Sequence, residues 1–260
     1  MSRSQSDKTD VQKALVINDL EVDFSGFKAV DGFKLQVDDG ELRVVLGANG
    51  AGKTTLMDLI SGTTKSTGGS VYLNGTDITN WEEHKIARAG VGRKFQIPSV
   101  FKELTVLQNL QVGESNEYSV FSNLLKSATK GYSDKIAEIL SLIELEHRIN
   151  ETASNLSHGE TQWLEIGMLL VQDPHVILLD EPTAGMTAQE TKKTADIINR
   201  LKGQHTLIVV EHDMGFVRAI AETITVMHLG QWLAEGSVSE IEKDPKVMEA
   251  YLGSGGIGHA

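Results

Sequence analysis

The sequence predicts an α/β fold in which a parallel sheet is joined to an antiparallel β part and an inserted helical part. Two continuous apolar runs, 176–180 and 206–211, are separated by a charged stretch with helical spacing, as in buried parallel strands joined by a crossover helix. Residues 14–37 instead alternate between apolar and polar side chains, which is typical of antiparallel strands. Residues 101–151 are rich in leucine and isoleucine at helical spacing, which indicates a helical lobe.

The composition is that of a single globular domain with an acidic surface. The chain has 260 residues, 40% of them hydrophobic, which is enough for one sizeable core. Its net charge of −12 argues against binding to nucleic acid, and without cysteine it can form no disulfide. No stretch approaches the ~18 apolar residues that a membrane span needs. We expect the domain over 13–253, with disordered ends at 1–12 and 254–260.

The expected elements follow in order along the chain. Ser25-Gly26 separates two antiparallel strands, and LRVVLG at 42–47 is a short strand that leads into a helix. SVYLNGTDI at 70–78 reads as a second hairpin. After the helical lobe and the two parallel strands, ITVMHLGQWLAEG at 224–236 predicts a last hairpin, followed by a short amphipathic helix.

A glycine-rich turn connects the strand at 42–47 to its helix. Residues 47–54 fit G-x-x-x-x-G-K-[ST], in which glycines let backbone N–H groups point inward at phosphate oxygens. Lys53 can bridge the β- and γ-phosphates, and the Thr54 hydroxyl can bind Mg²⁺. The alternative is a turn that caps an ordinary helix. The candidate nucleotide-binding residues of this turn are Gly47, Ala48, Asn49, Gly50, Ala51, Gly52, Lys53, Thr54 and Thr55.

Polar side chains also end the two parallel strands. Asp180 is placed to hold Mg²⁺, and Glu181 to orient or deprotonate an attacking water, unless the pair is only an acidic exit to the surface. His212 follows the next strand at the same edge of the sheet, where an imidazole could hydrogen-bond a γ-phosphate or serve a structural role. Gln96 is a weaker candidate, because an amide in a loop is usually only solvated.

The segment LSHGE at 156–160 resembles the LSGGQ signature of ABC-type ATPases, and it precedes Asp180 by about twenty residues as in that family. The resemblance covers residues 13–253 and identifies 47–54 as a Walker A motif and the run ending at Asp180 as Walker B. It implies a P-loop NTPase fold with a RecA-like core, an antiparallel β subdomain and an α-helical subdomain over about 97–170.

The same resemblance implies roles for single residues. Glu181 would be the catalytic glutamate, His212 the switch histidine and Gln96 the glutamine of the Q-loop, which makes all three catalytic. Mg²⁺ would be held by Thr54, Gln96 and Asp180. The implied cofactors are therefore ATP and Mg²⁺, and the implied activity is ATP hydrolysis coupled to transport across a membrane.

Further nucleotide contacts are implied outside the Walker A motif. An aromatic side chain of the first hairpin would stack on adenine; Phe24 matches that position best, and Phe27 is the alternative. Ser157 and Gly159 open a helix and would bind the ATP held by the opposite subunit of a dimer. Two sites would then form across one interface.

The chain also departs from the family pattern. His158 replaces the first glycine of the signature pair, and Glu160 replaces its glutamine, which brings a possible like charge near a triphosphate. Residues 184–187 lack the aspartate that ends the D-loop in many relatives, so no role is carried over for it.

Finer features resemble the importers for branched-chain amino acids, through EPTAGM, VVEHDM and a closing YLG. Within that group the chain is most similar to the ATPase subunits of urea importers, on residues 157–174, 211–217 and 228–236. The resemblance therefore implies uptake of urea or short-chain amides. The alternatives are a branched-chain amino acid importer, a non-transport ABC ATPase and, in another enzyme class, a P-loop kinase or GTPase.

The resemblance also implies partners and a location. The chain would form a homodimer, or a heterodimer with a related ATPase subunit, on two integral membrane permease subunits. A periplasmic substrate-binding protein would act indirectly through them. The dimer would lie peripherally on the cytoplasmic side of the inner membrane.

Overall fold

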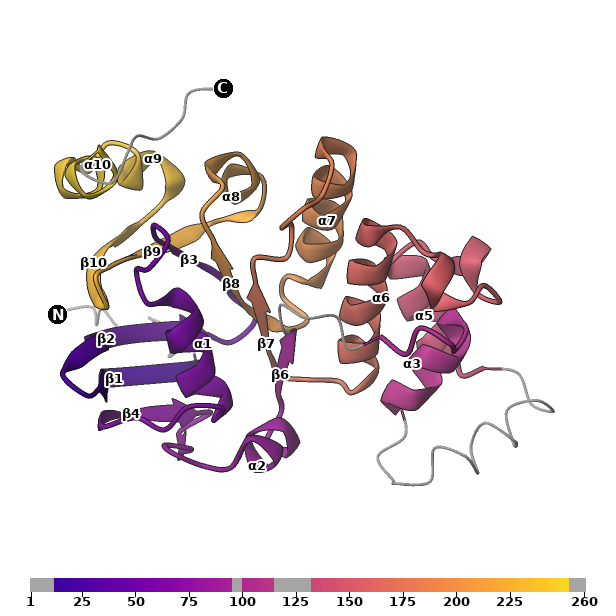
Figure 1. Cartoon of the computed structure of the whole chain (residues 1–260), viewed down its shortest axis with the longest axis horizontal. Helices are drawn as coiled ribbons and strands as arrows, with labels where there is room; N and C mark the ends of the chain where they lie inside the picture. Colours follow the sequence, from indigo (N-terminus) through magenta and orange to yellow (C-terminus); the bar gives the residue numbers. More distant parts are fainter. Residues whose placement is uncertain (1–11, 95–99, 115–131, 253–260) are drawn as a thin grey trace, which may run out of the picture.

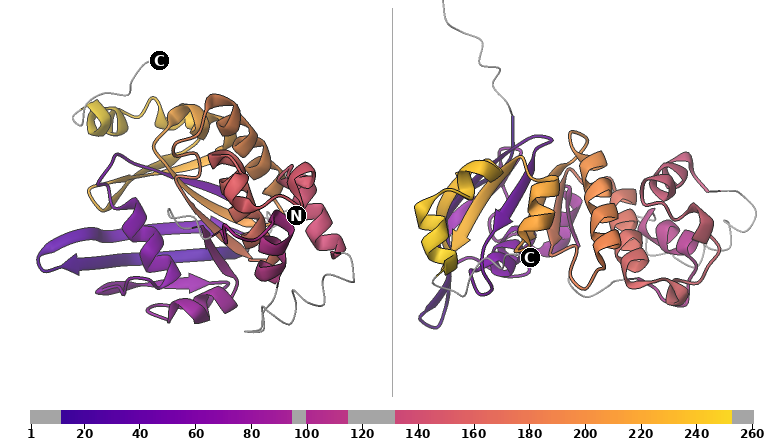
Figure 2. Two further views of the ribbon diagram at one scale, coloured as in Figure 1. Left: turned by 45° about the vertical axis from the view of Figure 1, so that its right-hand side comes forward. Right: turned by 90° about the horizontal axis from the view of Figure 1, so that it is seen from above.

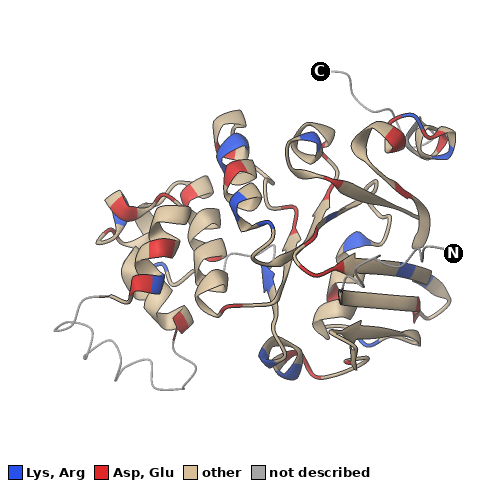
Figure 3. Cartoon of the chain, turned by 180° about the vertical axis from the view of Figure 1, so that it is seen from behind, with Lys and Arg blue, Asp and Glu red and all other residues tan. Residues whose placement is uncertain are grey.

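Two β-sheets and a set of helices form the computed structural model of the chain, which describes residues 12–94, 100–114 and 132–252 (Figure 1). The ends that we expected to be disordered lie almost entirely outside these residues. None of the helices in the described part of the chain is long and apolar enough to cross a membrane. Asp and Glu positions are spread over both the sheets and the helices (Figure 3).

The first sheet is antiparallel and is built from two hairpins, in strand order β2-β1-β4-β5. Ser25 and Gly26 turn the chain between β1 and β2 with φ of 56° and 97°, and Asn74 and Gly75 do so between β4 and β5 with φ of 48° and 77°. Positive φ at both central residues is typical of type I′ turns, whose twist matches that of the flanking strands. The strands are β1 (Lys13–Phe24), β2 (Phe27–Asp38), β4 (Gly68–Leu73) and β5 (Thr76–Asp77).

The second sheet is central to the fold and has the strand order β10-β9-β3-β8-β7-β6. Five of its strands are parallel, and β10 pairs antiparallel with β9 across a turn at Leu229 and Gly230. The strands are β3 (Leu42–Leu46), β6 (Val91–Lys94), β7 (Val176–Asp180), β8 (Thr206–Glu211), β9 (Thr223–His228) and β10 (Gln231–Gly236). The predicted parallel strands and last hairpin are confirmed.

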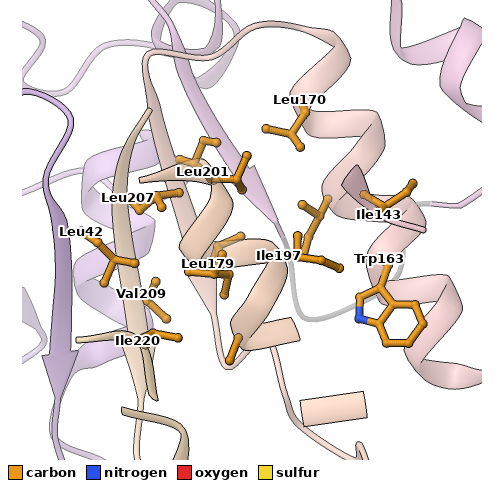
Figure 4. Close-up of a cluster of buried hydrophobic side chains, with 14 of the residues drawn as sticks. Leu42, Ile143, Trp163, Leu170, Leu179, Ile197, Leu201, Leu207, Val209 and Ile220 are labelled. Atoms are coloured by element: carbon orange, nitrogen blue, oxygen red, sulfur yellow. The ribbon is translucent and has the colours of Figure 1, made fainter. Parts of the chain in front are cut away.

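Successive side chains of the central strands enter two different cores, because side chains alternate between the faces of a sheet. In β3, Val44 packs toward the helices, whereas Val45 packs with the first sheet and α1. Strands β7 and β8 alternate in the same way: Leu179 and Val209 face the helical side, as Figure 4 shows. This two-sided burial explains why these strands are continuously apolar in sequence.

Helices cover the central sheet and extend it into a separate lobe. Helices α3 and α5 pack against α6 at the end of the molecule opposite the first sheet (Figure 2). Trp163 of α6 donates a buried hydrogen bond of 2.9 Å to Thr194 Oγ1 of α7. The helices are α1 (Lys53–Ser61), α2 (Glu83–Arg88), α3 (Val106–Glu114), α5 (Asp134–Leu142), α6 (His158–Val171), α7 (Ala188–Leu201), α8 (Met214–Ile220), α9 (Val238–Ile241) and α10 (Pro245–Leu252), with 3₁₀ turns at Glu146–Arg148 and Ala153–Asn155.

Strand β6 was not expected from the sequence, because two of its four residues are charged. Its last residue, Lys94, reaches Glu165 in the middle of α6, with 3.7 Å between Nζ and Oε2, and both side chains are only 3% exposed. Burial lowers the pKa of Lys94, and the Glu165 carboxylate opposes that shift. This ion pair joins the central sheet to the helix that carries the signature segment.

Replacing one member of this ion pair should lower the stability of the fold much more than replacing both. We expect Glu165→Leu to lower the free energy of unfolding by about 3–5 kcal/mol, because it leaves the Lys94 charge buried without its partner. The double variant Lys94→Met/Glu165→Leu should recover most of that loss. Urea unfolding of the three proteins measures this, and equal stability of the single and double variants would show that the pair is not coupled.

Candidate functional site

Three parallel strands end side by side at one edge of the central sheet, where ligands bind in open α/β folds. Strand β3 leads at Leu46 into the phosphate loop, defined here as residues 47–54, while β7 ends at Asp180 and β8 at Glu211. Because β8 pairs with both β3 and β7, these ends lie at the same edge. The fold therefore brings the predicted phosphate loop and the predicted carboxylates together.

The glycines of the phosphate loop are required by backbone shape and by close packing. Gly50 and Gly52 have φ of 80° and 102°, which side chains other than glycine rarely adopt. A Cβ on Gly52 would also lie 2.4 Å from the carbonyl oxygen of Ala29, and one on Gly47 would lie 2.6 Å from that of Met227. The loop is thus held tightly against β2 and β9. Gly52 has no side chain to cap α1, which leaves the start of this helix open to an anion.

Lys53 is folded back onto this loop. Its Nζ donates hydrogen bonds to the carbonyl oxygens of Gly47 and Ala48, at 2.7 and 3.0 Å, and the residue is 6% exposed. Burial lowers the pKa of Lys53, and the nearby carboxylates of Glu181 and Asp180 oppose the shift. The cation is therefore held at the loop by two carbonyl oxygens, which it would have to leave to reach phosphate groups.

A pocket of about 390 Å³ opens above the loop. Among the predicted residues of the glycine-rich turn, Gly47, Ala48 and Ala51 are not part of the pocket lining. Its lining residues are Phe27, Ala29, Asn49, Gly50, Gly52, Lys53, Thr54, Thr55 and Glu181. The pocket thus joins the phosphate loop to one carboxylate and to one aromatic side chain of the first sheet.

That aromatic side chain is Phe27, the alternative in our sequence analysis, and Phe24 is not among the lining residues. The two are directly paired across the hairpin of β1 and β2, so their side chains leave the same face of the sheet. Both rings are solvent-exposed, by 49% for Phe24 and 66% for Phe27. Phe27 lies two residues before Ala29 on β2, and Ala29 also lines the pocket.

Asp180 is buried at the strand end without satisfying its hydrogen-bonding capacity. It is 1% exposed, and neither carboxylate oxygen has a hydrogen-bond partner in the described structure. Burial raises its pKa, while Arg93 Nη2, 3.7 Å from Oδ2, and the neighbouring Thr54 hydroxyl oppose the shift. One such carboxylate beside a threonine hydroxyl fits Mg²⁺, which usually takes one or two protein ligands together with phosphate oxygens and waters.

Glu181 adopts an unusual backbone conformation directly after the strand. Its φ is 45°, in the left-handed region that non-glycine residues rarely enter, and its N–H donates to the carbonyl oxygen of Val210 at 3.0 Å. The carboxylate Oε1 lies 3.2 Å from Nδ1 of His212, which is half exposed. The structure thus pairs the two predicted residues, of which Glu181 lines the pocket and His212 does not. Gln96, the third predicted catalytic residue, lies outside the described residues.

Two residues at this edge were missed in the sequence. Glu211 is 1% exposed and accepts hydrogen bonds from Thr183 Oγ1 and from the His212 N–H, and its burial raises its pKa. Arg93 of β6 binds Asp58 Oδ1 at 2.6 Å, and so connects the helix α1 to the Asp180 carboxylate. A signal for Glu211 was its place at the end of a continuous apolar strand, but nothing in the sequence indicated the partners of Arg93.

The predicted signature residues lie away from this pocket. Residues 157–160, called the signature tip from here on, begin α6, which lies beyond β7 from α1 (Figure 1). Ser157 caps the helix: its Oγ accepts from the N–H of Glu160, and Glu160 Oε2 accepts from the N–H of Ser157. Glu160 Oε1 also lies 3.2 Å from Nε of Arg148. The extra acidic charge of this signature is therefore paired within the same lobe.

The second departure from the family pattern also has a partner. Nε2 of His158 lies 2.9 Å from the carbonyl oxygen of Ala184, in the segment that lacks the D-loop aspartate. His158 therefore connects the signature tip to the loop that follows Glu181.

Comparison with known proteins decides the family. The profile of the family described as ABC transporter matches residues 30–184, which include the phosphate loop, the signature tip and Asp180. The chain belongs to the ABC transporter family. A second profile, described as branched-chain amino acid ATP-binding cassette transporter, matches residues 233–257.

Relatives of this family match nearly the whole chain. The high-affinity branched-chain amino acid transport ATP-binding protein LivG of Salmonella typhimurium is 38% identical over 251 residues, covering 93% of this chain and 98% of LivG. BraF of Pseudomonas aeruginosa, with the same description, is 35% identical over 248 residues, covering 92% and 97%. The ADP conformation of MJ1267, an ATP-binding cassette of an ABC transporter, gives a TM-score of 0.79 at 32% identity and covers 93% of this chain and 99% of MJ1267.

These comparisons confirm the predicted α/β ABC ATPase fold. They also confirm the class of enzyme: the chain is an ABC-type ATPase, in which ATP hydrolysis is coupled to transport. The geometry of the site fits this activity, because the phosphate loop and the Glu181 carboxylate line one pocket, and the buried Asp180 carboxylate, which has no hydrogen-bond partner, lies directly before Glu181 at the strand end.

The pocket geometry predicts that Phe27, rather than Phe24, stacks on the base of the nucleotide. We expect Phe27→Ala to weaken ATP binding roughly three- to tenfold, the effect of one lost aromatic contact. Phe24→Ala is the matched control and should change affinity less than twofold. Titration with a fluorescent ATP analogue measures both, and a larger loss for Phe24→Ala would return the assignment to Phe24.

Proposed function

We propose that the chain is the ATP-hydrolysing subunit of an importer for branched-chain amino acids. The observation that carries this proposal is the match of residues 233–257 to a profile of that transporter class, at a part of the chain outside the ATPase motifs. The relatives that match over more than nine-tenths of the chain support it, since they are named for branched-chain amino acid transport. This substrate was the alternative in our sequence analysis.

We infer the roles of the site residues as follows. The amides of the phosphate loop and of the start of α1 hold the phosphates, and Lys53 leaves its two carbonyl acceptors to bridge the β- and γ-phosphates. Thr54 and Asp180 would hold Mg²⁺, which would neutralise charge on the phosphates. Glu181 orients and deprotonates the attacking water, and His212 fixes the Glu181 carboxylate and contacts the γ-phosphate.

A complete site requires a second subunit. The signature tip is not among the residues that line the pocket of its own chain, which supports a role for Ser157 and Gly159 at the ATP of a partner. Two such chains, or one chain and a related ATPase subunit, would close over two ATP molecules across one interface. ATP then stabilises the closed dimer, and hydrolysis releases it.

Transport requires membrane partners. We place the dimer on the cytoplasmic side of the inner membrane against two permease subunits, with a periplasmic binding protein delivering the substrate to them. Gln96, outside the described residues, would bind Mg²⁺ and transmit occupancy of the γ-phosphate position to the helical lobe.

Urea is the second candidate substrate. The observation that favours it is the sequence of residues 157–174, 211–217 and 228–236, which resembles the ATPase subunits of urea importers. All three segments belong to the ATPase, and we expect none of them to contact the transported molecule. They therefore bear on the subgroup of the transporter, and the substrate itself is selected by the permease and binding protein.

Replacing the proposed water-activating residue should separate binding from hydrolysis. We expect Glu181→Gln to lower the ATPase rate by roughly 10²- to 10⁴-fold, because it keeps shape but removes the basic carboxylate. ATP should still bind and should convert the variant to a stable dimer. Turnover assays and size-exclusion chromatography with ATP measure this, with exposed Glu222→Gln as the control. Wild-type turnover in Glu181→Gln would assign water activation elsewhere.

Reconstituted vesicles test the transported substrate. With the cognate permease subunits and binding protein, we expect ATP-dependent uptake of radiolabelled leucine that disappears in the Glu181→Gln variant. Uptake of urea without uptake of leucine would select the second candidate. If ATP drives the uptake of neither compound, the proposal of this importer class is wrong.

A further inference from the structure

One carboxylate joins the beginnings of two long helices. Glu190 Oε2 accepts hydrogen bonds from the N–H and the Oγ1 of Thr187, both at 2.9 Å, and so caps α7. Its other oxygen, Oε1, accepts from Ser157 Oγ at 3.3 Å and from the Gly159 N–H at 3.2 Å. Glu190 therefore binds the signature tip as well as its own helix.

This second contact is not needed to cap α6. Glu160 already completes the capping box of that helix with Ser157. The approach of Glu190 is also very close, since a Cβ on Gly159 would lie 2.5 Å from Glu190 Oε1. Only a glycine at this position allows the carboxylate to reach the tip.

The positive ends of two helices of 14 residues each meet at this carboxylate, which favours an anion there. Hydrogen bonds from Thr187, Gly159 and Ser157 lower the pKa of Glu190, so the group is a carboxylate at neutral pH. No Lys, Arg or His among the described residues forms an ion pair with it, and its partners are hydroxyl and amide donors. A phosphate oxygen could replace it on the donors of the tip.

The two donors of the tip are the ones that the partner's ATP requires. A serine hydroxyl has one proton, so Ser157 cannot donate to a phosphate while it donates to Glu190. The Gly159 N–H is occupied by the same oxygen. A γ-phosphate that arrived beside Glu190 would also meet a like charge.

We propose that Glu190 is an intrachain substitute for the partner's γ-phosphate: it occupies Ser157 and Gly159 in the separate chain and must be displaced before two chains close over ATP. The inference rests on the proposed ATP-bound dimer. Glu190 raises the ATP concentration at which the dimer forms. After hydrolysis, it recaptures the two donors and favours opening.

Glu190→Gln tests the proposal without removing the helix cap, because glutamine also serves at the third position of a capping box. When the amide oxygen of the glutamine takes the place of Oε2 at Thr187, its NH₂ group faces Ser157 and Gly159. An NH₂ group cannot accept the hydrogen bonds that Ser157 and Gly159 donate. We expect the ATP concentration for half-maximal dimerisation to fall on the order of tenfold, which corresponds to about 1.4 kcal/mol.

The measurement uses analytical ultracentrifugation in the non-hydrolysing Glu181→Gln background. Asp196→Asn is the matched control, because it removes an exposed negative charge from α7 outside the tip, and it should leave the ATP requirement unchanged. In a second measurement without nucleotide, the first amides of α6 should exchange with deuterium faster in Glu190→Gln than in its parent.

The outcomes separate this inference from the proposed function. If the parent dimerises with ATP and Glu190→Gln needs the same or a higher ATP concentration, the inference is refuted and the dimer stands. If the parent does not dimerise with ATP, the ATP-bound dimer itself is refuted, and the role of Glu190 with it. If Asp196→Asn lowered the ATP requirement equally, the loss of any negative charge on α7 would explain the effect. The specific contact of Glu190 with the signature tip would then be refuted.

Discussion

A carboxylate that is buried without hydrogen-bond partners destabilises a fold, and one such carboxylate lies at the centre of the proposed catalytic site. Asp180 sits at the end of a strand that is buried on both faces, and the structure offers it Arg93 and the Thr54 hydroxyl nearby but no hydrogen bond. In the site that we propose, a bound Mg²⁺ would give this carboxylate the partner that it lacks here.

The pocket and the signature tip are separate, and different elements of the fold hold them. The central sheet holds the phosphate loop rigidly, whereas the tip belongs to α6, which reaches the sheet through contacts such as the Lys94–Glu165 pair. Charge at the tip is balanced within the chain, since Arg148 pairs with Glu160, while Glu190 uses helix-end donors. The donors of the tip therefore have partners in a single chain, and in the dimer that we propose a partner's nucleotide would have to compete with these contacts.

Much of the fold and of the proposed site could be predicted from the sequence, because these features depend on residues that are close together along the chain. The phosphate loop needs its glycines in a fixed order, the apolar runs at β7 and β8 mark strands buried on both faces, and Ser25-Gly26 breaks the first hairpin. The signature segment was recognisable despite His158 and Glu160. The substrate was not recognisable in this way, because in the transporter that we propose other subunits select it. For the substrate, the relatives favour the alternative over urea.

By itself, the sequence determined the class of fold and located Lys53 in a phosphate loop and Asp180 and Glu181 at a strand end, since these follow from spacing along the chain. Its resemblance to ABC-type ATPases indicated the ATPase chemistry. Only the tertiary structure decided which residues meet across long separations. It made β6 a strand despite its charges, showed that Phe27 rather than Phe24 lines the pocket, and brought Glu190 onto the signature tip. Such contacts depend on how side chains of distant elements pack, and no local pattern records that packing.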